Sequence, residues 1–220
     1  MHNTVKNLLD IEKNIQVHLN KLNINNTPNI VAVSKTFKID KILPLIEHGH
    51  NDFGENKVQE AVQKWTDIKK INSKIRLHMI GKLQTNKVKF AVQIFDYIHS
   101  VDNEKLAKKI ANECKKLNKK IKIFIKIKIE NESQKGGIEP NELENFYKNC
   151  TNELGLDIIG LMSIPPNDNQ SNYYFSEMKK LKSLINTKEL SMGMSSDYLE
   201  AIKHEATFIR IGSSIFGQRS

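Results

Sequence analysis

The stretch Asn29-Ile30-Val31-Ala32-Val33-Ser34-Lys35-Thr36 has the composition of a buried parallel strand. It is short, it is rich in β-branched residues, and Pro28 and polar residues bound it. Lys35 stands at its carboxyl end, where an amine can point into a cavity. Burial there disfavours the ammonium form, and a neutral amine can attack a carbonyl group to form a Schiff base. The competing interpretation is a lysine whose charged end reaches solvent, as it does for most lysines at strand ends.

Short apolar runs of this kind alternate with amphipathic segments along the chain. Further strands are expected at residues 51–54, 77–80, 97–99, 121–129, 158–162, 189–191 and 207–210. Helices are expected at 3–22, 39–48, 56–70, 84–92, 103–118, 141–150, 170–186 and 196–204, with a short terminal helix. Eight strands that alternate with helices, behind one leading helix, predict an α/β protein with a (β/α)8 TIM barrel. An open doubly wound sheet would allow the same alternation.

Bulk properties favour a single domain over residues 1–220, because no linker or composition break divides the chain. No apolar stretch approaches the roughly 18 residues of a membrane span, so no membrane partner is expected. The N-terminus lacks the pattern of a secretory signal. The two cysteines, Cys114 and Cys150, have no C-x-x-C spacing and are expected to be reduced thiols. Together these features predict a cytoplasmic protein.

The net charge of +9 raises the possibility of a nucleic-acid-binding module. The lysines are spread through nearly every segment, arginine is scarce and aromatic residues are sparse, so a solvated lysine coat is the preferred interpretation. The seven histidines show no H-E-x-x-H or similar spacing, and a metal site is therefore not expected.

The active face of a barrel lies at the carboxyl ends of its strands. That rule collects Lys35, Asn56, His78, His99, Ser100, Met162, Ser191, Ser195, Arg210, Gly212, Ser213 and Ser214. Two Gly/Ser clusters near the end of the chain, residues 191–195 and 211–214, have the character of a phosphate cradle, since glycine admits an anion close to backbone N–H groups. Each cluster alone would rather be an ordinary turn, with Ser195 as the N-cap of the next helix. Their pairing in one sector of the barrel favours a phosphate site. His78 could be a base or a ring contact, but a structural role is preferred. Asn56 could cap its helix or face the pocket.

Seven segments carry a family resemblance: AVSKT (32–36), FGENKVQE (53–60), HMIGKLQTNK (78–87), HSVD (99–102), GLMSIP (160–165), LSMGMSSD (190–197) and RIGSSIFGQR (210–219). In this order and spacing they resemble the pyridoxal phosphate homeostasis proteins, which bind pyridoxal 5′-phosphate (PLP) and are related to the barrel domain of alanine racemase. The resemblance implies that Lys35 forms the Schiff base with PLP. It implies that Ser195, Gly212 and Ser213 hold the phosphate and that Arg210 approaches the pyridine nitrogen. It further implies a pocket lined by Asn56, His78, Met162 and Ser191. Leu77, Lys82 and Ser196 depart from the usual family pattern at the rim.

An arginine beside the pyridine nitrogen should keep that nitrogen unprotonated, which weakens the ring as an electron sink. Alanine racemases resembling this barrel take a tyrosine from a second domain, and this chain is expected to lack one. We therefore expect a monomeric PLP carrier that passes the cofactor to apo-enzymes and has no efficient catalysis of its own. The alternative is a PLP-dependent amino-acid racemase, with His78 or a tyrosine of a partner chain as the second base.

Overall fold

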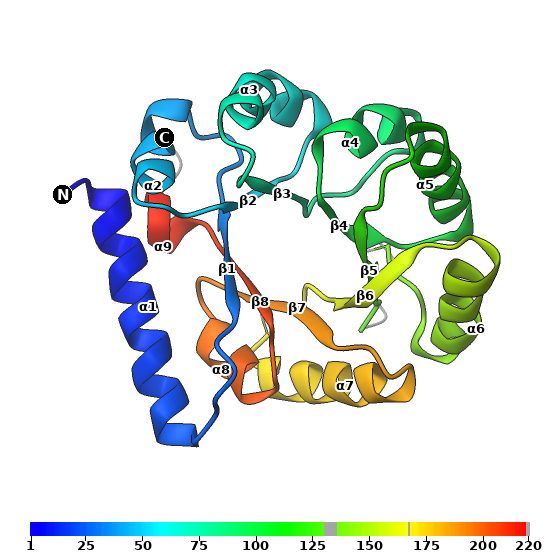
Figure 1. Ribbon diagram of the computed structural model, residues 1–220. Coiled ribbons are helices and arrows are strands. Elements are labelled where there is room, and N and C mark those ends of the chain that lie inside the picture. The colour runs from blue at the N-terminus through cyan, green and yellow to red at the C-terminus, as the bar shows by residue number, and fades with distance from the viewer. Residues whose placement is uncertain (130–135, 167, 219–220) are drawn as a thin grey trace.

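Eight parallel strands close into a barrel in sequence order, and helices surround it (Figure 1). This computed structural model describes residues 1–129, 136–166 and 168–218, so Arg219 of the segment 210–219 lies outside the described residues. Strand β1 pairs with both β2 and β8, which closes the sheet. The (β/α)8 barrel is confirmed, and the open doubly wound sheet is wrong.

The strands follow the predicted apolar runs. They are β1 (Asn29–Val33), β2 (Asp52–Glu55), β3 (Arg76–Met79), β4 (Tyr97–Val101), β5 (Lys122–Lys126), β6 (Asp157–Met162), β7 (Glu189–Met194) and β8 (Phe208–Ile211). The helices are α1 (Asn3–Leu22), α2 (Leu43–Glu47), α3 (Val58–Ile71), α4 (Val88–Ile94), α5 (Glu104–Leu117), α6 (Leu143–Lys148), α7 (Ser171–Leu184), α8 (Tyr198–Lys203) and α9 (Ser213–Phe216). Short 3-10 turns η1 (Ile39–Lys41), η2 (Thr85–Lys87) and η3 (Pro140–Glu142) precede three helices, and a π-helical turn η4 (Asn149–Glu153) follows α6.

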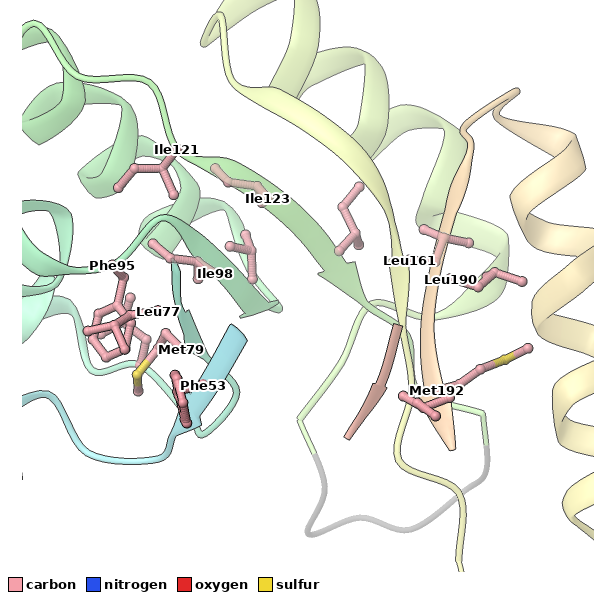
Figure 2. Packing of buried hydrophobic residues seen from close by; sticks show 14 of the residues in the cluster. Phe53, Leu77, Met79, Phe95, Ile98, Ile121, Ile123, Leu161, Leu190 and Met192 are labelled. Carbon is pink, nitrogen blue, oxygen red and sulfur yellow. The ribbon is translucent and has the colours of Figure 1, made fainter. Parts of the chain in front are cut away.

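Side chains alternate between two apolar layers, because successive residues of a strand point to opposite faces. The larger layer lies between the sheet and the helices, and Phe53, Leu77, Ile98, Ile123 and Leu190 belong to it (Figure 2). The smaller layer fills the barrel interior and consists of Val31, Tyr97, Phe124, Met162 and Phe208. The barrel is thus a packed core beneath its carboxyl-end face, as this fold requires.

Strand β5 is shorter than the run of residues 121–129 predicts. The regular pairing with β6 ends at Lys126 opposite Met162, and Ile127 instead forms an isolated bridge with Ile138. The alternation of isoleucine and lysine continues past the point where the chain leaves the sheet, so periodicity alone could not mark the end. In the described ranges, no helix combines the length and the apolar character that crossing a membrane requires.

Candidate functional site

A cavity of about 740 Å³ opens at the carboxyl ends of the strands. This volume lies within the usual range for small-molecule sites, which is roughly 300–1,000 Å³. Six of the nine predicted site residues line it: Lys35, Asn56, Ser195, Arg210, Gly212 and Ser213. These six come from segments that are up to 178 positions apart in the chain, and barrel closure through the β1–β8 pairing brings them together.

Strand alternation places Lys35. Val31 belongs to the interior layer, and Val33 and Lys35, two and four residues later, line the cavity above it. Lys35 is half-buried. Thr36 follows in the left-handed region at φ 69°, which is uncommon for a β-branched residue. Such a conformation persists only where the surroundings hold it, and the Thr36 N–H donates to a carboxylate of Glu60 at 2.6 Å.

The buried Glu55 carboxylate fixes the residue that precedes Lys35. Glu55 accepts hydrogen bonds from the Ser34 hydroxyl at 2.7 Å, from Lys64 Nζ at 3.0 Å and from Trp65 Nε1 at 3.0 Å. Lys64 Nζ also donates to the Ser34 carbonyl at 2.9 Å. The backbone on each side of Lys35 is therefore fixed to α3 by charge-assisted hydrogen bonds, which sets the direction in which the Lys35 side chain leaves the backbone.

Asn56 reaches the cavity because the chain after β3 passes close to it. Gly81 lies against the Asn56 backbone, and a Cβ atom at Gly81 would stand 2.7 Å from Asn56 Cα. Only glycine permits that approach. The sequence allows Asn56 either to cap its helix or to face the pocket. In the structure α3 begins at Val58 after Lys57, and Asn56 faces the pocket.

Arg210 crosses the floor of the cavity as a buried cation. Its Nη1 donates to the Ser191 hydroxyl at 2.6 Å and its Nη2 donates to the Ser163 carbonyl at 2.7 Å. Burial lowers the pKa of Arg210 to about 10, so the guanidinium is still charged at neutral pH. Within the described ranges no carboxylate forms an ion pair with it. A buried guanidinium with remaining N–H donors at a cavity wall is suited to an acceptor atom of a ligand.

The Ser195 hydroxyl joins the turn after β7 to the turn after β8. It accepts from the backbone N–H of Gly212 at 3.3 Å and of Ser214 at 3.4 Å. Ser195 is not the N-cap of α8, as the sequence suggested; Asp197 holds that position, and its carboxylate accepts from the Met194 N–H at 2.6 Å. Freed from capping, Ser195 forms a rim of N–H and O–H donors with Gly212 and Ser213.

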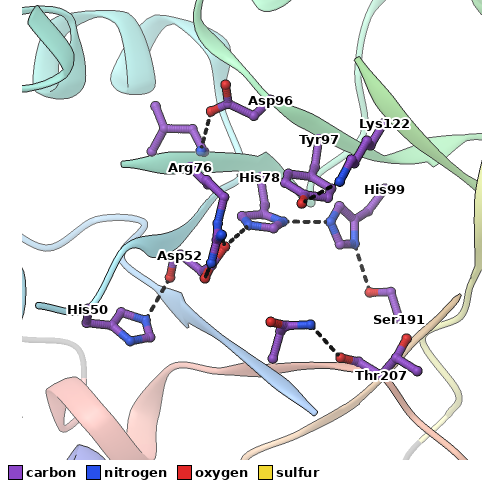
Figure 3. Close-up of polar contacts among 12 residues, drawn as sticks. His50, Asp52, Arg76, His78, Asp96, Tyr97, His99, Lys122, Ser191 and Thr207 are labelled. Carbon is purple, nitrogen blue, oxygen red and sulfur yellow. Dashed lines mark hydrogen bonds and ion pairs between the residues drawn. The ribbon is translucent and has the colours of Figure 1, made fainter. Parts of the chain in front are cut away.

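His78, Met162 and Ser191 do not line the cavity. Met162 is fully buried in the interior layer. His78 and Ser191 are also inaccessible and belong to a row of polar side chains inside the barrel, together with Asp52 and His99 (Figure 3). All three residues point inward, but they lie below the level of Lys35, so the description of them as pocket-lining residues needs correction. Ser191 is the nearest to the site, because it contacts Arg210 directly.

Two lysines of the cavity were not predicted. Lys126 ends β5 on the same face as the interior residue Phe124, and Lys82 follows Gly81 after β3. The alternation of residues 121–129 reveals two faces but does not say which one faces the interior. Here the isoleucines pack against the helices and the face with the lysines turns inward. Ser100, which the strand-end rule did collect, lines the cavity beside a β-bulge of β4.

Comparisons with known proteins show the family to which this chain belongs. The family model "Alanine racemase, N-terminal domain" matches residues 7–220. The Pyridoxal phosphate homeostasis protein of Pasteurella multocida is 34% identical over 97% of each chain, and that of Haemophilus influenzae is 36% identical over 99% of this chain and 97% of its own. The structure of PipY from Synechococcus elongatus with PLP bound is 31% identical and covers 92% of this chain and all of its own, with a TM-score of 0.80. The chain belongs to the pyridoxal phosphate homeostasis proteins, within the family of alanine racemase N-terminal domains.

Proposed function

We propose that this chain binds PLP in the cavity, holds it on Lys35 as a Schiff base, and takes part in PLP homeostasis by releasing it to other amines without efficient catalysis. The observation that carries the proposal is the shared cavity: a partly buried lysine, a buried arginine and a rim of donors line one space. Bound PLP supplies an aldehyde carbon for a lysine and an aromatic ring that can accept electrons.

The residues that line the cavity suit the phosphate, the pyridine nitrogen and the aldehyde of PLP. Ser195, Gly212 and Ser213 would hold the phosphate, whose charge suits hydrogen-bond donors. The Gly212 N–H, which donates to the Ser195 hydroxyl in this structure, would then donate to the phosphate instead. The Arg210 guanidinium would donate to the pyridine nitrogen. Lys35 Nζ in its neutral form would add to the aldehyde carbon, and the aldehyde oxygen would leave as water with the two amine protons.

Two features argue against efficient turnover of amino acids. A charged Arg210 beside the ring nitrogen opposes its protonation, and an unprotonated ring is a weaker electron sink. The cavity lining also contains no histidine, tyrosine, cysteine, aspartate or glutamate among the described residues. A racemase needs a second acid or base across from the lysine. His78, considered for that role, is fully buried and cannot reach the cavity.

Hydrogen exchange separates a carrier from a racemase. The PLP-loaded protein is incubated with α-deuterated amino acids, and loss of deuterium is followed by mass spectrometry. We expect loss close to that caused by free PLP, together with transfer of PLP to an added apo-enzyme. Deuterium loss at rates of about 1 s⁻¹ or faster, typical of enzymes, would instead establish a racemase.

Replacing Ser195 by alanine is expected to weaken the affinity for PLP by about tenfold, the equivalent of one good hydrogen bond to a charged group. The affinity for pyridoxal, which has no phosphate, should stay within about twofold of the wild-type value. Titration of both ligands, followed by absorbance, measures the two effects. Ser214→Ala is the control, because it leaves the Ser214 N–H in place and its side chain is outside the cavity lining. An equal loss for both ligands would place the phosphate elsewhere.

A further inference from the structure

A row of hydrogen bonds runs through the barrel interior from the amino ends of the strands to the cavity. The His78 Nε2 atom lies 3.0 Å from Asp52 Oδ1, and His78 Nδ1 lies 3.0 Å from His99 Nε2. His99 Nδ1 lies 2.8 Å from the Ser191 hydroxyl, which in turn accepts from Arg210. Figure 3 shows the row from Asp52 to Ser191. We use the name interior relay for the five residues Asp52, His78, His99, Ser191 and Arg210.

The two ends of the interior relay determine where each proton lies. Arg210 can only donate, so the Ser191 oxygen accepts from it and the Ser191 hydroxyl is available to donate to His99 Nδ1. His99 then carries its proton on Nε2 and donates to His78 Nδ1. His78 likewise carries its proton on Nε2 and donates to Asp52. Every donor meets one acceptor, and both imidazoles are neutral Nε2–H tautomers.

Burial and charge support the neutral forms. Burial lowers the pKa of His99 well below its usual value, and the neighbouring His78 and Arg210 lower it further. Burial also lowers the pKa of His78, although its hydrogen bond to the Asp52 carboxylate opposes this. Protonation of the pair would place an additional positive charge beside the buried Arg210, and among the described residues no carboxylate lies near His99 to compensate for it.

The relay is held rigidly at its far end. Arg76 donates through Nε to Asp52 Oδ1 at 2.7 Å and also pairs with Asp52 Oδ2. These contacts outweigh the burial of Asp52 and hold the pKa of its carboxyl below the usual range, so Asp52 is an anion that accepts only. The rings cannot turn freely, since His78 stacks on Tyr97 at 4.2 Å and His99 stacks on Phe124 at 4.3 Å between ring centroids.

We propose that Asp52 is a positioning residue for Arg210. Through His78 and His99 the carboxylate fixes the proton order in which the Ser191 hydroxyl donates to His99 and accepts from Arg210 alone. The second anchor of Arg210 is the Ser163 carbonyl, and the remaining guanidinium donors are then directed to the cavity. This inference rests on the proposed function insofar as the directed donors meet the ring of PLP.

The test uses Asp52→Asn in the full chain. An asparagine side chain can offer either its oxygen or its amide group to His78, so it no longer imposes one proton order. We expect the Nδ1–H tautomer to appear at both His78 and His99 in nitrogen-15 NMR spectra of histidine-labelled protein, whereas the wild type should show only Nε2–H at these two residues. We also expect the affinity for PLP to fall by about tenfold, because Ser191 must then accept from His99 as well as from Arg210.

Asp96→Asn is the matched control. Asp96 also lies at the amino ends of the strands, pairs with Lys69 and accepts from the Leu77 N–H at 2.8 Å, but it does not contact the relay. It should lose stability while keeping wild-type tautomers and PLP affinity.

A charged imidazole or an Nδ1–H on His99 in the wild type would overturn the inference, and that measurement needs no variant to fold. Wild-type tautomers and affinity in Asp52→Asn would overturn it as well. A wild type that binds no PLP would refute the proposed function alone, because the tautomers are read without ligand.

Discussion

Replacing Lys35 by alanine is expected to abolish the absorbance band that PLP develops when it is added to the protein. The reason is chemical: a Schiff base needs an amine, and the strand direction of β1 places Lys35 in the cavity above the interior layer. The rim of Ser195, Gly212 and Ser213 remains in the variant. We therefore expect weak, non-covalent binding of PLP to persist without the band.

The matched control is Lys126→Ala, since Lys126 also lines the cavity and also ends a strand. It should keep the band. A band of undiminished intensity in Lys35→Ala, or its loss in Lys126→Ala alone, would show that the amine was assigned to the wrong strand.

Replacing Glu55 by alanine is expected to lower the free energy of unfolding by about 3–5 kcal/mol, the usual effect of removing one partner of a buried ion pair. The change leaves Lys64, which is 10% exposed in its side chain, with Glu60 as its one remaining carboxylate among the described residues, and it leaves the indole N–H of Trp65 without the Glu55 acceptor. It also releases Ser34, next to Lys35. We expect slower formation of the PLP band in the fraction that folds. Urea unfolding followed by tryptophan fluorescence measures the first effect.

Glu113→Ala provides the comparison. Glu113 pairs with Lys109 and Lys116, whose side chains are 42% and 66% exposed, so both regain water when the carboxylate is removed. The loss of stability should be smaller, and the PLP band should form at the wild-type rate, because α5 lies away from β1, the strand that precedes Lys35 (Figure 1). Equal losses in the two variants would mean that Glu55 has no special role beneath the site.

The parts of the site that the sequence predicts are those set by strand ends. Lys35, Arg210 and the turns around Ser195 and Gly212 each follow an apolar run directly, and barrel closure brings them together. The alternation of residues along a strand does not predict how deep in the barrel a side chain lies. His78 and Ser191 point inward like Lys35, but they occupy a lower level of the barrel, and depth depends on how far each strand is staggered against its neighbours.

The interior relay shows a second limit. Asp52 opens the short strand β2, and nothing in its local sequence distinguishes it from a solvated acid at a strand start. Its role depends on the pairing of Asp52 with Arg76 and of Gly54 with His78 across the sheet, which only the register of β2 against β3 provides. The sequence does not predict Lys126 as a cavity residue for a similar reason. A strand with lysines on one face suggests that this face is exposed to solvent, whereas in the closed barrel it faces the interior.

The most direct test of the central claim is to reduce the PLP-loaded protein with borohydride, digest it and map the modified peptide by mass spectrometry. Reduction makes the bond between PLP and its lysine permanent. We predict one modified site, Lys35, at close to one PLP per chain. Modification of another lysine in its place, or a low level spread over many lysines, would contradict the account.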